Sequence, residues 1–259
     1  ARKLKDSSMA ITMLNNIGII HGYFGNFSEQ LDYTLQVKNA IESIKDSSKM
    51  SGLYHNLANC YLNLGQNRKA VEAAEYSVYL YTDLKLRNDY INRAYATLAQ
   101  GYDGLQNFDS ALYCYNNAIK ESVRLNDKYA EGSIYGYLCN LFASMNRFSD
   151  MLKAAEKSLS LSRELQSRQM MASSLYNVAY AQFFNNNNKE AWKNITEALA
   201  IATKDSLRDE LKNSYSVLSY IAAKEGDYVT SIRAKQKSDS IQTAFLNEQE
   251  VKSTAEFLK

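Results

Sequence analysis

The chain repeats itself about every forty residues, and this period limits the possible folds more than any other feature of the sequence. An aliphatic residue followed by a small one recurs six times, with successive small residues 40, 41, 40, 40 and 40 positions apart. A period between about twenty and fifty residues is typical of repeat architectures, in which each copy is one supersecondary unit. The six pairs are Ile17-Gly18, Leu57-Ala58, Leu98-Ala99, Leu138-Cys139, Val178-Ala179 and Leu218-Ser219.

Three further positions keep the same register in every copy. Twelve residues after each small residue come Gln30, Ala70, Ala111, Met151, Ala191 and Ser231. Seven residues later come Val37, Ser77, Ala118, Ser158, Ala198 and Ser238. An aromatic residue or asparagine stands three positions before the first of these sets, at Phe27, Asn67, Phe108, Phe148, Asn188 and Tyr228. Small residues allow two helix backbones to approach closely, so the pattern predicts a pair of antiparallel helices in each copy.

Polar residues mark both ends of the predicted helices. Each hairpin is expected to turn at a group such as Gly65-Gln66-Asn67 or the run from Asn185 to Asn188. Proline, which breaks helices, is absent from the 259 residues. A second set of breaks precedes the first helix of each copy, and its Asp, Asn and Ser side chains are expected to act as N-caps. These breaks are Asp46-Ser47, Asn88-Asp89, Asp127, Ser167 and Asp205.

The pattern resembles the tetratricopeptide repeat (TPR) family, in a long variant of about forty residues. The third copy matches the family's signature positions with Leu98, Ala99, Tyr102, Phe108, Ala111, Tyr115 and Ala118. The second copy matches with Leu57, Ala58, Tyr61, Gly65 and Ala70. Gln30, Met151 and Ser231 depart from the pattern, and the usual closing proline is missing. The resemblance covers about residues 6–245 and implies an all-α, right-handed α-solenoid of about six antiparallel helix hairpins.

The predicted organisation is a repeat region over residues 1–238, followed by a C-terminal extension of the last helix over residues 239–259. The extension is interpreted either as a cap on the last repeat or as a stalk. The residue pattern from Lys237 to Ile241 and from Asn247 to Glu250 resembles the end of the TPR sensor regions of Bacteroidetes-type regulators. That resemblance implies a membrane tether and a kinase or DNA-binding domain downstream. The predicted repeats are about 6–44, 46–86, 88–125, 127–165, 167–204 and 205–238.

Composition excludes several classes of function. The formal net charge is only +2, from 30 basic and 28 acidic residues, so no nucleic-acid partner is expected. The two histidines, His21 and His55, and the three cysteines have no spacing typical of a metal site or a nucleophilic triad. The cysteines are interpreted as buried free thiols. We therefore predict no enzymatic activity, no metal and no cofactor.

The first helix of each hairpin is expected to line a concave groove that binds a partner. Asn59, Gln100 and Asn140 stand one residue after the small position in three consecutive copies, and amides of this kind can both donate to and accept from a peptide main chain. A solvated polar groove is the alternative interpretation. Aromatic residues gather in the later copies, where they anchor a partner or pack against the tail helix. The predicted groove residues are Asn15, His55, Asn59, Gln100, Asn140, Tyr176, Tyr180, Phe183 and Tyr220.

These observations predict a non-catalytic TPR scaffold that binds a peptide or protein segment, as the sensory or adaptor region of a larger signalling regulator. The alternative is a structural spacer without a groove ligand, which forms a homodimer through its C-terminal helix. The near-neutral charge and the free cysteines fit the cytoplasm, whereas the resemblance of the tail favours the periplasm.

Overall fold

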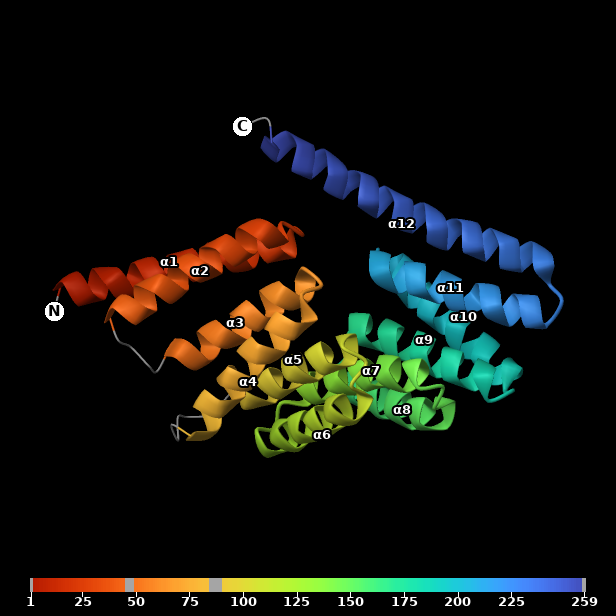
Figure 1. Ribbon diagram of the computed structural model, residues 1–259. Helices are drawn as coiled ribbons and strands as arrows, with labels where there is room; N and C mark the ends of the chain where they lie inside the picture. Colours follow the sequence, from red (N-terminus) through yellow and green to blue (C-terminus); the bar gives the residue numbers. More distant parts are fainter. Residues whose placement is uncertain (1, 45–48, 84–89, 258–259) are drawn as a thin grey trace. The chain divides into compact units, whose positions relative to one another are not determined.

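The computed structural model describes residues 2–44, 49–83 and 90–257, and these residues form helices joined by short turns. Within these ranges the chain forms twelve α-helices and no strand, which confirms the predicted all-α, TPR-like solenoid (Figure 1). The helices are α1 (Arg2–Tyr23), α2 (Phe27–Ile44), α3 (Met50–Asn63), α4 (Asn67–Asp83), α5 (Ile91–Gly104), α6 (Phe108–Arg124), α7 (Lys128–Ser144), α8 (Phe148–Glu164), α9 (Arg168–Phe184), α10 (Asn188–Lys204), α11 (Arg208–Lys224) and α12 (Tyr228–Phe257).

The helices form two compact units, which we call unit 1 (residues 1–125) and unit 2 (residues 126–259). In unit 1, α1 packs on α2, α3 on α4 and α5 on α6; in unit 2, α7 packs on α8, α9 on α10 and α11 on α12. The first helices of neighbouring hairpins also touch, α3 with α5 in unit 1, and α9 with both α7 and α11 in unit 2. The limits predicted for the individual repeats, and the division after residue 238, stay predictions.

The forty-residue period consists of two halves of twenty residues. Every helix from α6 to α11 has 17 residues, and three residues join it to the next. The middle residue of each turn adopts a left-handed backbone conformation, which lets the last turn of the helix close on itself. After α5, for example, Gln106 N–H donates to the carbonyl of Asp103 at 2.8 Å and Asn107 N–H donates to that of Tyr102 at 2.9 Å. These middle residues are Gly25, Gly65 and Gly226, with φ 77°, 68° and 81°, and Gln106, Asn126, Asn146, Gln166, Asn186 and Ser206, with φ between 53° and 62°.

The small residues of the repeat are buried between the paired helices. Ala58, Ala99, Cys139 and Ala179 are all 0% exposed, so a larger side chain at these positions would push the helices apart. The repeat position that holds Ser77, Ser158 and Ser238 also joins the paired helices. Each serine hydroxyl donates a hydrogen bond to the carbonyl of the residue 26 positions earlier, on the partner helix. These bonds run from Ser77 to Ser51 (2.8 Å), from Ser158 to Gly132 (2.9 Å) and from Ser238 to Lys212 (3.0 Å).

Two of the predicted N-caps are confirmed and one is wrong. The side chains of Asp127 and Ser167 accept from the backbone N–H groups three residues later. Asp205 instead ends α10, and α11 follows Leu207, which makes no side-chain cap. Asp205 was misassigned because the turn needs three residues, so the cap position falls two residues later. The caps predicted at 46–47 and 88–89 lie outside the described residues.

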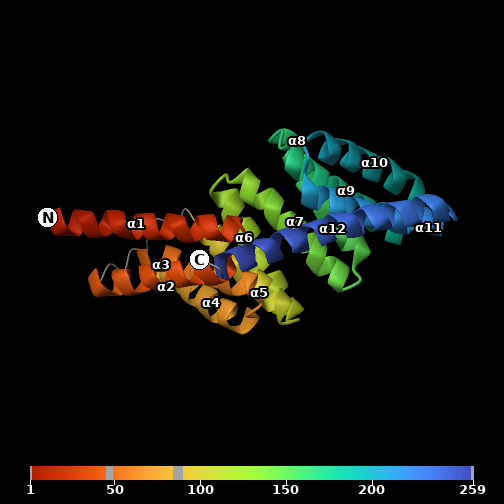
Figure 2. The same cartoon turned by 90° about the horizontal axis from the view of Figure 1, so that it is seen from above.

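Helix α12 is much longer than its partner. It has 30 residues against 17 in α11, which correspond to about 45 Å and about 25 Å at 1.5 Å per residue. The two helices lie side by side in both views (Figures 1 and 2), with Ser238 opposite Lys212. The C-terminal part of α12 therefore continues past the start of α11. None of the described helices has the length and apolarity needed to cross a membrane.

Candidate functional site

The structure places all nine predicted groove residues on the first helix of a hairpin, but in two separate units. Unit 1 holds Asn15 on α1, His55 and Asn59 on α3, and Gln100 on α5. Unit 2 holds Asn140 on α7, Tyr176, Tyr180 and Phe183 on α9, and Tyr220 on α11. Each unit is therefore described by itself.

In unit 1, two of the predicted groove residues bind each other. The Asn59 Nδ2 group donates to His55 Nε2 at 3.1 Å. The hydroxyl of Thr97 on α5 donates to Asn59 Oδ1 at 3.2 Å and lies 3.4 Å from His55 Nδ1. Since Thr97 has one hydroxyl proton, these contacts fit a neutral His55 that carries its proton on Nδ1. The three side chains thus form a closed hydrogen-bonded triangle.

The environment of His55 keeps the ring neutral. Burial, and then the positive charge of Arg93, lower the pKa of His55 from 6.5 to about 4. Both causes act against the imidazolium, because burial removes its hydration and Arg93 repels it. His55 is therefore a structural acceptor for Asn59 near neutral pH.

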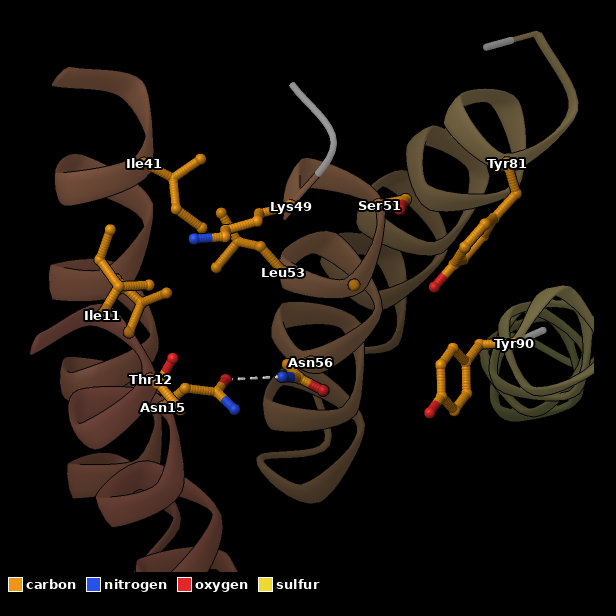
Figure 3. Close-up of a pocket in the computed structure, with 12 residues that line it drawn as sticks. Ile11, Thr12, Asn15, Ile41, Lys49, Ser51, Leu53, Asn56, Tyr81 and Tyr90 are labelled. Atoms are coloured by element: carbon orange, nitrogen blue, oxygen red, sulfur yellow. Dashed lines mark hydrogen bonds between the residues drawn. The ribbon is translucent and has the colours of Figure 1, made fainter. Parts of the chain in front are cut away.

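Asn15 is bound to the neighbouring hairpin beside a cavity of unit 1. Its Oδ1 accepts from Asn56 Nδ2 on α3 at 2.8 Å (Figure 3). The cavity, of about 440 Å³, is lined largely by apolar residues of α1, α2 and α3, among them Ile11 and Leu53, with Tyr90 at its edge. Gln100 is half-buried on α5, one turn after the Thr97 of the triangle.

In unit 2, the first helices enclose two adjoining cavities. One, of about 280 Å³, reaches from α7 across α9 to Glu210 at the start of α11. The other, of about 330 Å³, continues along the same helices to Tyr220. Asn140, Tyr176 and Asn177 line both cavities, so we treat the two as one groove and call it the unit 2 groove.

Asn177 is the feature of this groove that the sequence analysis missed. The residue is only 5% exposed, yet within the described part of the chain its side chain makes no hydrogen bond. The amide is not enclosed by protein, because the buried side-chain atoms that lack a partner in the described residues are Asn188 Oδ1 and Ser214 Oγ. Its amide faces the groove, where a bound molecule would supply the missing bonds.

Tyr176, next to Asn177, is held at the wall of the groove. Its hydroxyl accepts from Asn213 Nδ2 on α11 at 3.4 Å. Burial raises the pKa of Tyr176, and the nearby charge of Glu210 adds to the rise. The ring is therefore a fixed neutral surface that carries one hydroxyl.

The remaining aromatic residues of the prediction form a cluster with one another. Tyr180 makes edge contacts with Phe148 and Phe184, with ring centroids 6.3 Å and 4.9 Å away, and it lies 6.4 Å from Tyr220. Phe183 packs against Phe184 and beneath the ammonium group of Lys224, which is 4.8 Å from its ring centroid. Tyr220 is 52% exposed, so this cluster presents one tyrosine at the end of the unit 2 groove.

Two kinds of reactive group can be followed in the described residues, clusters of metal-binding side chains and cysteine thiols. No group of three or more His, Cys, Asp or Glu side chains among them could hold a metal ion. The three cysteines are free and buried, which confirms that interpretation. Burial raises the pKa of Cys114 to about 11 and that of Cys139 to about 12, so these thiols are poor nucleophiles near neutral pH.

Comparison of the sequence with known proteins gives limited information. No family model matches the chain. One curated relative, the outer dynein arm-docking complex subunit 4 of Xenopus laevis, is 29% identical over 134 residues. The match covers 52% of this chain and 24% of the relative, so it spans about a quarter of that protein's length.

Comparison of the structure identifies the fold. A putative kinesin light chain with TPR-like repeats from Podospora anserina has a TM-score of 0.63 and 16% identity, covering 76% of this chain and 96% of its own. A signal-transduction ATPase with a TPR sensor from Pyrococcus horikoshii has a TM-score of 0.69 and 13% identity, covering 96% and 38%. A Rap conjugation gene regulator of plasmid pLS20, in complex with the Phr* peptide, has a TM-score of 0.66 and 14% identity, covering 93% and 76%. At these TM-scores the structural similarity establishes a TPR-like fold, while the low identities show no closer relationship.

Proposed function

We propose that this TPR-like chain is a non-catalytic scaffold whose unit 2 groove binds an extended peptide or protein segment. The observation that carries the proposal is the amide of Asn177, which lines both cavities of the groove and makes no hydrogen bond in the described part of the chain. An asparagine can donate to a peptide carbonyl and accept from a peptide N–H at the same time. The amide of Asn140 lines the same groove and extends this capacity along it.

Structures with the same fold support this reading. The Rap regulator is seen with a peptide, and the archaeal ATPase carries its TPR region as a sensor. We propose that the chain is the sensory or adaptor region of a larger signalling regulator. The four unit 1 residues of the sequence prediction take a secondary place in the proposal, because Asn59 and Asn15 already hold partners within the chain.

The experiment measures binding and stability of an Asn177→Ala variant. The probe is an array of N-acetylated, C-amidated heptapeptides of varied sequence, which presents main-chain groups without terminal charges. Wild-type protein is expected to bind a subset of the peptides, and the variant to lose this binding at least about tenfold, as expected when about 1.5 kcal/mol of hydrogen bonding is removed. Its free energy of unfolding should change by less than about 0.5 kcal/mol, since no hydrogen bond is lost in the free protein.

Asn92 provides the matched control. It is also a buried asparagine on a first helix, but its Nδ2 donates to Ser122 Oγ at 3.0 Å and its Oδ1 accepts from the N–H of Arg93 at 2.9 Å. Asn92→Ala should therefore lower the free energy of unfolding by about 1–3 kcal/mol. If no peptide binds, or if the Asn177→Ala variant binds the same peptides with unchanged affinity, the proposal fails.

The alternative, a dimerising spacer, draws on α12. Its outer face exposes Tyr228, Val229 and Ile232, which are 67%, 60% and 57% exposed, and the helix continues past the start of α11. In this proposal two copies pair through these residues. Replacing Ile232 with Lys should then convert dimers into monomers in light scattering, and a wild-type protein that is monomeric at all concentrations rules the spacer out.

A further inference from the structure

Glu210 is a buried carboxylate that faces the unit 2 groove. It lies in the first turn of α11, is 7% exposed, and lines the 280 Å³ cavity. Its Oε1 accepts from Gln169 Nε2 at 3.0 Å and from Ser173 Oγ at 3.2 Å, both on α9. These two bonds fix the carboxylate in one orientation.

Only one of the two oxygens of the Glu210 carboxylate, Oε1, accepts hydrogen bonds from the described residues. Within the described part of the chain Glu210 forms no salt bridge, and no donor reaches its Oε2. A buried carboxylate is normally paired with a cation, since burial otherwise penalises the charge. The hydrogen bonds to Glu210 within the described residues come from the neutral side chains of Gln169 and Ser173, and its place in the first turn of α11 puts it at the positive end of the helix dipole. Oε2 is therefore the carboxylate oxygen that is left for a ligand in the cavity.

The surroundings of Glu210 fit a long cationic side chain. The same cavity is lined by the rings of Tyr129 and Tyr176, and aromatic faces attract ammonium and guanidinium groups. A side chain built on Gly136 would meet nothing within 4 Å, so this glycine keeps the cavity open on the α7 side. About 280 Å³ is at the small end of the range for ligand pockets and suits one side chain more than a whole organic ligand.

We infer that this cavity is a specificity pocket for a lysine or arginine side chain of the bound peptide. Glu210 receives the cation, and Asn177, which lines the same cavity, holds the adjacent main chain of the peptide. The inference rests on the proposed function and adds to it the charge of the ligand: the preferred segments are basic.

The test uses the blocked heptapeptides in pools that differ only in the fixed central residue. Wild-type protein is expected to bind the Lys and Arg pools about tenfold more tightly than the norleucine pool, which has nearly the same length but no charge. Glu210→Gln keeps an oxygen that accepts from Gln169 and Ser173 and removes only the charge. In this variant the preference should fall below about twofold, while binding of the norleucine pool changes little.

A steric variant tests the position of the pocket independently. Gly136→Leu fills the open space beside Glu210 and should abolish the preference for basic residues. Gly52→Leu is its control, because Gly52 is also a helical glycine with nothing within 4 Å of a built Cβ, but it lies in unit 1. Circular dichroism of each variant establishes that the helices are intact.

The outcomes separate this inference from the proposed function. Peptide binding that depends on Asn177 but shows no preference for Lys or Arg overturns the pocket and leaves the groove proposal standing. A preference for basic residues that survives in Glu210→Gln also overturns it. If no pool binds, the groove proposal fails and the specificity pocket fails with it.

Discussion

Acidification below pH 6.5 is expected to destabilise unit 1 through His55. The folded chain holds this ring neutral, because Nε2 must accept from Asn59 and because burial and Arg93 lower its pKa from 6.5 to about 4. In the unfolded chain the ring takes up its proton near pH 6.5. Between about pH 6.5 and 4 the unfolded state therefore binds more protons than the folded state, and the stability falls as the pH falls.

The size of the effect follows from the two pKa values. At pH 5 the unfolded histidine is almost fully protonated and the folded one is mostly neutral, which corresponds to a loss of about 2 kcal/mol relative to pH 7.5. Urea titrations monitored by circular dichroism measure the free energy of unfolding at both pH values. His55→Gln removes the titrating group, so its loss between pH 7.5 and 5 should be smaller than that of the wild type by about 2 kcal/mol.

His21, the only other histidine, gives the control. The His21→Gln variant keeps His55, so its free energy of unfolding should fall between pH 7.5 and 5 as much as that of the wild type. Asp and Glu side chains also titrate near pH 5, but they contribute equally to both proteins and cancel in the comparison. If His55→Gln and the wild type lose the same stability, then the ring is not held neutral and the triangle with Asn59 and Thr97 is not as described.

Two further predictions concern the backbone. Gly101→Ala should lower the free energy of unfolding by about 1–3 kcal/mol, since its Cβ would lie 2.8 Å from Val71 Cγ2 and 3.4 Å from Val71 N; the paired Gly52→Ala, with open space around it, should raise it by up to about 1 kcal/mol in the same urea titration. Gln166→Gly should raise the melting temperature, because Gln166 has φ 53° and glycine adopts this conformation without strain. The relief of strain is roughly 1 kcal/mol, from which the greater conformational freedom of glycine in the unfolded chain is subtracted. Unchanged stability in Gly101→Ala or a lower melting temperature in Gln166→Gly contradicts these steric arguments.

The helical hairpins could be predicted from the sequence because their constraints are steric and recur in every copy. A small residue is needed wherever two backbones approach, so Ala58 and its equivalents carry the period. The aromatic or asparagine position of each copy, from Phe27 to Tyr228, proves to be the first residue of the second helix. The exact turn position was harder to predict, since a left-handed residue in each turn can be Gln, Asn or Ser and gives no fixed signal. For this reason Asp205 was taken for a cap.

The candidate site was only partly predictable. The spacing correctly put His55 and Asn59 on one face of a helix, but the same spacing of four residues lets them bind each other. Asn177 and Glu210 gave no signal, because an unpaired side chain becomes visible only when the neighbouring helices are in place. Sequence reasoning finds the surface that faces the groove, whereas the hydrogen bonds decide which of its residues are available to a ligand.

Equivalent positions on the first helices of the repeats differ in their hydrogen bonds between unit 1 and unit 2. Asn56 on α3, Thr97 on α5, Tyr137 on α7 and Asn177 on α9 occupy the same position of successive first helices. In unit 1 the polar groups at this position are satisfied within the chain, since Asn56 donates to Asn15 and Thr97 donates to Asn59. In unit 2 the equivalent Asn177 has no such bond in the described part of the chain. The amide of Asn177 lines the groove, so it is available to a ligand in a way that the paired side chains of Asn56 and Thr97 are not. If a bound main chain completes the bonds of Asn177, the Asn177→Ala variant loses binding without losing stability. If only solvent pairs the amide, the variant binds as the wild type does.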